Sequence, residues 1–259
     1  MSRIVVKVGT TTLAYPGGRL NIRHVDELIK VLSDLKNAGH EIILVSSGAI
    51  GVGVGRLSLS GRPADMPGKQ AAAAVGQCRL MDIYDTRFSE YDHVVGQILL
   101  TREDLDDPER RGNFENTMAK LLEWHVLPII NENDTVATAE IAVGDNDTLS
   151  AIVATCINAD INILMSDIDG LYTADPHKDP DAKLISVVPE LTEEIMALGG
   201  GSNSSQGTGG MATKLRAAQI CTTHGIDMII CNGSHPSLLY DIMDGKAIGT
   251  RFIGKKENA

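Results

Sequence analysis

The sequence predicts an α/β protein whose core is a mostly parallel sheet with helices on both faces. Short runs rich in β-branched residues alternate along the chain with segments whose apolar residues recur every three or four positions. These are the patterns of strands and helices. The runs are almost continuously apolar, which indicates strands buried on both faces. An alternation of this kind favours a parallel sheet that binds ligands beyond the carboxyl ends of its strands.

The strands are expected at six places: residues 4–8, 41–45, 94–100, 126–130, 161–165 and 228–231. The first helix is predicted from apolar residues at helical spacing between Ile22 and Leu35, with Asn21 as its N-cap and Gly39 as its stop. Four further helices are expected at residues 69–88, 113–124, 147–157 and 210–224.

Two segments depart from this alternation. Residues 135–143 alternate between β-branched and other residues, which predicts a hairpin lying over a site. Residues 199–210, GGGSNSSQGTGG, are too rich in glycine and serine to hold a fixed shape by packing. We therefore expect a flexible loop there, ordered by a ligand.

Composition limits the function. The chain has 259 residues, is 43% hydrophobic and 22% charged, and has no apolar run as long as a membrane span. No Pro- or Ser-rich linker divides it, so one domain is expected. The net charge of −11 argues against a nucleic-acid partner. The four cysteines form no CxxC pair and the N-terminus lacks an apolar signal segment, which predicts reduced thiols and a cytoplasmic protein.

Two lysines next to glycines are the strongest functional signal. Lys7 lies inside the apolar run 4–8 and is followed by Gly9, and Lys214 closes the sequence TGGMATK. A lysine in a buried strand is costly unless an anion meets it, and glycines let backbone N–H groups approach phosphate oxygens. The pair predicts a site for a transferring phosphoryl group. The other interpretation of Lys7 is a strand-edge lysine that extends to solvent.

Two polar clusters, 131–134 and 144–147, stand at predicted strand or hairpin ends. Their carboxylates and amides suit the ammonium and carboxylate groups of an amino acid, and one aspartate could instead orient the lysines. A helix N-cap would explain one such aspartate but not two clusters.

Several known motifs are absent. TGGMATKL lacks the second glycine and the Ser/Thr after lysine of a P-loop, and Arg56 stands where the last Rossmann glycine would fall. No HRD or DFG triplet occurs, which excludes a protein kinase. The seven histidines show neither metal-binding spacing nor a triad order, so hydrolase chemistry has little support.

The chain resembles the amino-acid kinases from about residue 4 to 250, and the resemblance rests on six motifs in the family's order. These are KVGT at Lys7, SSGAIGVG at Ser46, NENDTVA at Asn131, GDNDTLSA at Gly144, GLYTADP at Gly170 and TGGMATK at Thr208. Within the family the match is to members that phosphorylate the side-chain carboxylate of L-glutamate with ATP, which is the first step toward proline. The resemblance implies a three-layer αβα sandwich with an open, mostly parallel sheet, and Mg²⁺ with ATP.

The resemblance also implies roles for individual residues. Catalysis would involve Lys7, Lys214 and Asp147, the last orienting the two lysines. Glutamate would be held by Ser47, Asp134 and Asn146, with Asp145 nearby. ATP would be bordered by Lys7, Ser166, Asp167, Thr208, Gly209, Gly210, Met211, Ala212, Thr213 and Lys214. No residue is assigned as a metal ligand, and Ser166 replaces the threonine that is common in the family.

The resemblance further implies one domain over residues 1–259, with residues 1–160 serving mainly the amino acid and 161–259 mainly the nucleotide. Many relatives continue into a C-terminal PUA domain, which this chain is not expected to have. Proline as a feedback inhibitor and a homo-oligomer are also family expectations. The alternatives that stay open are another amino-acid kinase, for aspartate or N-acetylglutamate, and a non-catalytic amino-acid sensor. An RNA-binding module is the weakest alternative.

Overall fold

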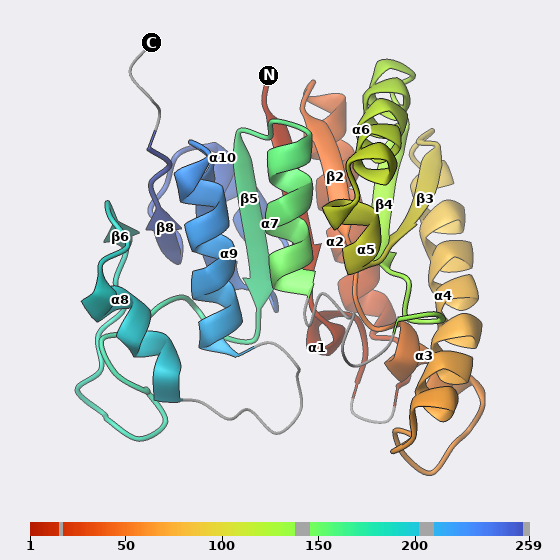
Figure 1. Cartoon of the computed structure of the whole chain (residues 1–259), viewed down its shortest axis with the longest axis horizontal. Helices are drawn as coiled ribbons and strands as arrows, with labels where there is room; N and C mark the ends of the chain where they lie inside the picture. The colour runs from red at the N-terminus through yellow and green to blue at the C-terminus, as the bar shows by residue number, and fades with distance from the viewer. Residues whose placement is uncertain (16–17, 138–145, 202–209, 256–259) are drawn as a thin grey trace.

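A computed structural model describes residues 1–15, 18–137, 146–201 and 210–255 and contains one eight-stranded sheet. The strand order is β3-β4-β2-β1-β5-β7-β8-β6 (Figure 1). The bounds are β1 Arg3–Val8, β2 Glu41–Val45, β3 Val95–Leu100, β4 Leu127–Glu132, β5 Ile161–Ser166, β6 Val187–Val188, β7 Asp227–Asn232 and β8 Thr250–Phe252. Every pairing is parallel except β7 with β8. The expected mostly parallel sheet is confirmed, and all six expected strands are present.

Helices cover both faces of the sheet. On one face lie α5 (Arg102–Asp106), α6 (Pro108–Glu123), α7 (Asn146–Cys156) and α9 (Met211–Thr223), and on the other lie α2 (Ile22–Asn37), α4 (Met66–Ser89) and α10 (Leu238–Met243) (Figure 1). Each face has its own hydrophobic cluster, because side chains alternate along a strand. In β1, Ile4 and Val6 join one cluster and Val5 joins the other. The three-layer sandwich is therefore confirmed.

The five expected helices are present, and the ends of α2 match the prediction. Asn21 caps α2 by accepting a hydrogen bond from the backbone N–H of His24. The helix stops at Asn37, and Gly39 follows with a φ of 95°, which glycine adopts without strain. The helices α4, α6, α7 and α9 correspond to the four others, and α6 begins five residues earlier than the expected 113, at a proline after the N-cap Asp107.

Five α-helices of the described residues were not expected: α1 (Thr10–Leu13), α3 (Ala49–Arg56), α5, α8 (Glu193–Ala197) and α10, of which α3 is the longest. The glycine-rich segment GVGVG lies in α3, which packs against α4. Gly53 and Gly76 make this possible, because a Cβ on Gly53 would lie 1.8 Å from the Ala72 carbonyl oxygen and one on Gly76 would lie 1.8 Å from that of Ala49. Glycine has a low helix propensity, so the sequence does not indicate a helix here. Close backbone contact between α3 and α4 compensates for that low propensity.

Two further expectations need correction. The prediction that strands are buried on both faces is wrong for β3, most of whose residues are partly or fully exposed because it is an edge strand. The segment 199–210 is not irregular throughout, since Leu198–Gly201 form a 3₁₀ turn after α8 (Glu193–Ala197). Residues 202–209 of that segment, and 138–143 of the expected hairpin, lie outside the described residues.

Candidate active site at the carboxyl ends of the strands

The predicted site residues that the structure describes lie at one edge of the sheet. Strand β1 lies in the middle, and the chain builds β2, β4 and β3 on one side before α7 leads to β5 on the other. The carboxyl ends of these strands point to the same edge, at the lower side of Figure 1. The point where the strand order reverses is the usual ligand site of such sheets. Here it lies at the ends of β1 and β5.

At this point two buried lysines share one buried carboxylate. Lys7 Nζ lies 2.6 Å from Asp147 Oδ1, and Lys214 Nζ lies 3.0 Å from Asp147 Oδ2. Thr213 Oγ1 lies 3.1 Å from Asp147 Oδ2. The exposed fractions are 8% for Lys7, 4% for Lys214 and 1% for Asp147. Lys7 is therefore not a strand-edge lysine that extends to solvent.

Three elements bring this cluster together. Lys7 has the same parity in β1 as Val5, whose side chain faces α7 and α9. Asp147 lies in the first turn of α7, where the helix dipole favours a carboxylate. Lys214 lies in the first turn of α9, which packs against α7. Residues that are 67 to 207 positions apart thus meet because β1, α7 and α9 are packed together.

The cluster has an excess of one positive charge. Burial raises the pKa of Asp147, but Lys7 and Lys214 outweigh burial and lower it to about 2. With both lysines charged, one carboxylate balances only one of them. A buried site with a net positive charge next to an open sheet edge is suited to an anion.

Next to the lysines lies a cluster of amides and hydroxyls. The side-chain nitrogen of Asn146 lies 2.8 Å from the Ser46 carbonyl oxygen, 2.7 Å from Ser47 Oγ and 2.9 Å from Asn131 Oδ1. Ser46 and Ser47 follow β2 directly, and Gly48 has a φ of 93°, a conformation that favours glycine. The sharp turn at Gly48 begins α3 and leaves Ser47 beside Asn146.

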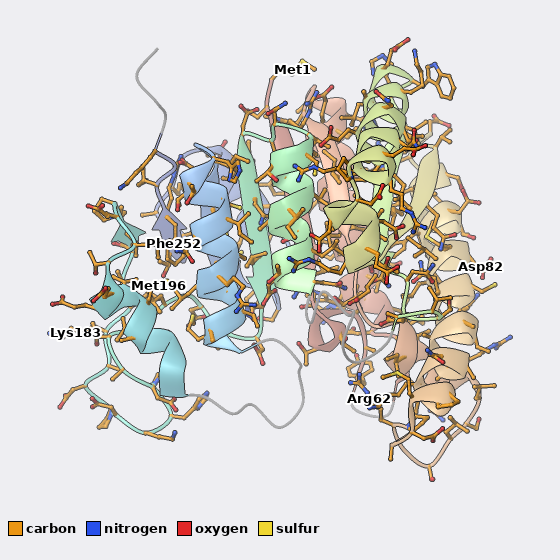
Figure 2. All side chains as sticks on the ribbon, in the orientation of Figure 1. Met1, Arg62, Asp82, Lys183, Met196 and Phe252 are labelled. Atoms are coloured by element: carbon orange, nitrogen blue, oxygen red, sulfur yellow. The ribbon has the colours of Figure 1, made fainter. Side chains whose placement is uncertain are left out.

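The other predicted residues lie around these two clusters. Asp134 lies in the turn after β4, where burial raises the pKa of its carboxyl group and Arg62 opposes that shift. Figure 2 shows Arg62 at the same end of the molecule. Ser166 ends β5, is buried, and donates a hydrogen bond of 3.0 Å to the exposed Asp167. The contacts within the described residues join Ser166 to Asp167 rather than to the lysine cluster.

The glycine-rich segment is only partly described. Gly210 is the N-cap of α9, and its carbonyl oxygen accepts hydrogen bonds from the backbone and the hydroxyl of Thr213. Met211 and Ala212 form the start of that helix. Asp145, Thr208 and Gly209, which were also predicted at the site, lie outside the described residues.

Two buried residues of the site were not among the predicted ones. The side chain of Asn131 lies in the amide cluster, and its nitrogen donates a 2.8 Å hydrogen bond to Gln77 Oε1 on α4. Asn131 belongs to a recognised polar cluster, from which only Asp134 was selected. Gln77 has a weaker signal, since it is a polar residue at a helix position shared with the buried Ala73, Leu80 and Tyr84.

Two absences apply to the described part of the chain. In it, no three His, Cys, Asp or Glu side chains are grouped so that they could hold a metal ion. None of its helices is both long and apolar enough to cross a membrane.

The fold and the site define an α/β protein with two buried lysines and a net positive charge at the switch point of its sheet. The chain belongs to the amino acid kinase family, whose model matches residues 2–232. It is 52% identical over 258 residues to glutamate 5-kinase of Clostridium perfringens, covering 98% of this chain and 96% of that protein. It is 53% identical over 259 residues to glutamate 5-kinase of Listeria monocytogenes, with 98% and 94% covered.

Solved structures with lower sequence identity have the same fold. UMP kinase from Bacillus anthracis aligns with a TM-score of 0.68 at 16% identity, covering 98% of this chain and 97% of that one. Carbamate kinase from Giardia lamblia bound to AMP-PNP aligns with a TM-score of 0.68 at 18% identity, covering 98% and 99%. At this identity the likeness extends to the fold alone.

Proposed function

We propose that this protein transfers the γ-phosphoryl group of ATP to the side-chain carboxylate of L-glutamate, forming ADP and L-glutamyl 5-phosphate. This is glutamate 5-kinase activity, the first step of proline biosynthesis. The observation that supports it most is the buried cluster in which Lys7 and Lys214 share Asp147. Identity above 50% to glutamate 5-kinases over nearly the whole chain supports the choice of glutamate.

The reaction needs cations more than it needs a base. A glutamate side chain has a pKa near 4.3, so it is already ionised at neutral pH and can attack without losing a proton. One carboxylate oxygen forms a bond to the γ-phosphorus, and the bond from that phosphorus to the oxygen bridging to the β-phosphate breaks as ADP leaves. The difficulty is to bring one anion up to another. Preorganised positive charge lowers that barrier.

In this proposal the two lysines contact the transferring phosphoryl group, and Asp147 holds them in place beforehand. A lysine has many rotamers, and fixing it during the reaction would cost conformational entropy. The short contacts of 2.6 and 3.0 Å to Asp147 fix both ammonium groups in advance. Because the cluster keeps an excess positive charge, the lysines can still attract phosphate oxygens while they are paired with Asp147.

Glutamate binds, in the same proposal, at the amide cluster. Ser47 and Asn146 lie together at the end of β2, and Asp134 lies in the turn after the neighbouring β4. A hydroxyl, an amide and a carboxylate suit the α-carboxylate and α-ammonium groups. Asp145 is assigned to this side from the resemblance.

ATP binds on the other side, along Ser166, Asp167 and residues 208–214. Among the described residues no side chain caps the N-terminus of α9, and the N–H groups of a helix N-terminus suit phosphate oxygens. Both carboxylate oxygens of Asp147 already face lysines, so Asp147 is poorly placed as a metal ligand. The residues fit a Mg²⁺ ion that is bound by ATP phosphates and water, which would neutralise phosphate charge during transfer.

The test is to trap the acyl phosphate with hydroxylamine, using L-glutamate, ATP and Mg²⁺. Glutamyl hydroxamate is expected from the parent protein. Lys7→Ala and Lys214→Ala should remain folded and lose roughly 10²-fold or more in kcat, as when a preorganised transition-state donor is removed. Full turnover in either variant would contradict the assignment of that lysine.

The same assay separates the alternatives. Aspartate and N-acetylglutamate serve as comparison substrates, and a higher kcat/KM for either would place the protein elsewhere in the family. Ligand binding without hydroxamate from any substrate would indicate a sensor.

We also propose a cytoplasmic location, supported by the four free cysteines, which suit a reducing compartment. Proline inhibition, a homo-oligomer, and the division into an amino-acid part and a nucleotide part follow from the family resemblance. An unchanged glutamate KM in saturating proline, or a monomeric mass in light scattering, would contradict the first two.

A further inference from the structure

The amide of Asn146 has only one possible orientation in this structure. Its nitrogen lies 2.8 Å from the backbone carbonyl oxygen of Ser46, and a carbonyl oxygen can only accept. The group facing Ser46 must therefore be the NH₂ end. The other terminal atom of the amide is then the side-chain oxygen of Asn146, which is buried and has no hydrogen-bond donor among the described residues.

The neighbouring Asn131 is fixed in the same way. Its side-chain oxygen accepts a 2.9 Å hydrogen bond from the backbone N–H of Glu132, and an N–H can only donate. The same oxygen faces the nitrogen of Asn146 at 2.9 Å. The nitrogen of Asn131 must then find an acceptor elsewhere, and it finds Gln77 Oε1 at 2.8 Å. Gln77 is 8% exposed and Asn131 is 1% exposed, so water is a poor substitute.

A chain of hydrogen bonds thus runs from α4 to the candidate glutamate site. Gln77 holds Asn131, Asn131 holds Asn146, and Asn146 is left with an acceptor that the described part of the protein does not use. A buried acceptor without a donor is costly, and a ligand that brings an N–H removes this cost. Of the groups on glutamate, only the α-ammonium can donate.

We propose that Gln77 is a positioning residue for recognition of the α-ammonium group of the substrate. By holding Asn131, it keeps the Asn146 amide turned with its oxygen free to accept an N–H from that group. This inference rests on the proposed glutamate phosphorylation. It adds a residue of α4 that does not touch the substrate and is 54 positions from Asn131.

The test uses Gln77→Met, which keeps the length of the side chain and removes the acceptor. The glutamate KM should rise about five- to tenfold, the effect of one weakened buried hydrogen bond, while kcat and the KM for ATP change less than about twofold. Glutarate, which is glutamate without its amino group, should inhibit the parent and the variant with the same Ki. Gln77→Glu keeps an acceptor oxygen and should restore much of the glutamate affinity.

Tyr84→Phe is the matched control. Tyr84 lies two turns further along the same buried side of α4, and its hydroxyl is 2.8 Å from Ser46 Oγ, so this variant also loses one buried hydrogen bond. It leaves the amide chain intact, and its glutamate KM should stay within about twofold of the parent. If Gln77→Met does not fold, Gln77→Asn withdraws the acceptor by one methylene and carries the same expectation.

Three results would overturn the inference: an unchanged glutamate KM in Gln77→Met, an equal rise in the glutarate Ki, or an equal rise in KM in Tyr84→Phe. Failure of the proposed function looks different, because the parent protein itself would then form no glutamyl hydroxamate.

Discussion

Replacing Asp147 with asparagine is the sharpest test of the lysine cluster. Asp147→Asn keeps the size and shape of the side chain and removes the negative charge. The variant leaves Lys7 and Lys214 buried at 8% and 4% exposure without their shared counter-ion. Each must then lose its charge or remain as an uncompensated buried ion, and both are costly.

The expected loss of stability follows from the distances. At an effective dielectric constant of about 20, charges 2.6 and 3.0 Å apart attract by roughly 6 kcal/mol per pair. Most of that attraction offsets the cost of removing the three groups from water. Removing one partner of a buried pair typically destabilises by about 3–5 kcal/mol, and this is the expected fall in the free energy of unfolding.

Urea unfolding measures this change, and Glu123→Gln is the matched control. Glu123 and Lys120 are also 2.6 Å apart, but their side chains are 62% and 50% exposed. Because solvent screens such a pair, the control should change the free energy of unfolding by less than about 1 kcal/mol. Equal distances with unequal effects would identify burial as the cause.

ATP should partly rescue the variant. Phosphate oxygens can take the place of the missing carboxylate, so MgATP should raise the urea midpoint of Asp147→Asn by more than it raises that of the parent. The kcat should fall by roughly 10²-fold, because the lysines are no longer held in advance. Parent-like stability and turnover in this variant would refute the argument that Asp147 organises the lysines.

Other predictions address pH and packing. Burial raises the pKa of Asp147, but its two lysine partners outweigh burial and lower that pKa from 3.8 to about 2. The ionised carboxylate should therefore contribute about 2 kcal/mol of stability, which is present above pH 4 and lost as the pH falls toward 2. Urea titrations of Asp147→Asn should show a shallower loss of stability across that pH window. Burial raises the pKa of Asp134, so the glutamate KM should rise on acidification at a higher pH than an ordinary aspartate would give; Asp134→Asn should start with a raised KM and lose this dependence. Gly76→Ala would place a Cβ 1.8 Å from the Ala49 carbonyl oxygen and should lower the free energy of unfolding by a few kcal/mol. A Cβ on Gly112 would have no atom within 4 Å, so Gly112→Ala should raise the free energy of unfolding by about 0.5–1 kcal/mol. Equal urea midpoints for the two variants would contradict the close packing of α3 on α4.

Local patterns were sufficient for most of the sheet and the long helices. Strands such as β2 (Glu41–Val45) form where a β-branched run predicts one, because an apolar run of that length must be buried. Helix α2 begins after Asn21 and stops before Gly39, as predicted, because capping and positive φ are properties of single residues. Local patterns were insufficient for α3, whose glycines make sense only against α4, and for β3, whose exposure follows from its place at the edge of the sheet.

The site divides in the same way. The chemistry of Lys7 and Lys214 could be predicted from residue type and neighbouring glycines, since a buried lysine needs a partner wherever it lies. The roles of Ser47 and Asn146 were implied by the family resemblance. The role of Gln77 could not be predicted, because a glutamine near alanines on a helix has no local feature that shows whether its side chain bonds to a site residue or to solvent.

The sequence by itself determined the alternation of six strands with the long helices, the need for an anion near two lysines, and membership of the amino acid kinase family. The family resemblance implied that Asp147 orients both lysines, but only the tertiary structure gave the distances of these contacts and the hydrogen bonds that run from Gln77 through Asn131 to Asn146. The reason is physical. Propensity, capping and burial act over a few residues, whereas an ion pair or a hydrogen bond depends on a distance of about 3 Å, which is set only when distant parts of the chain pack together.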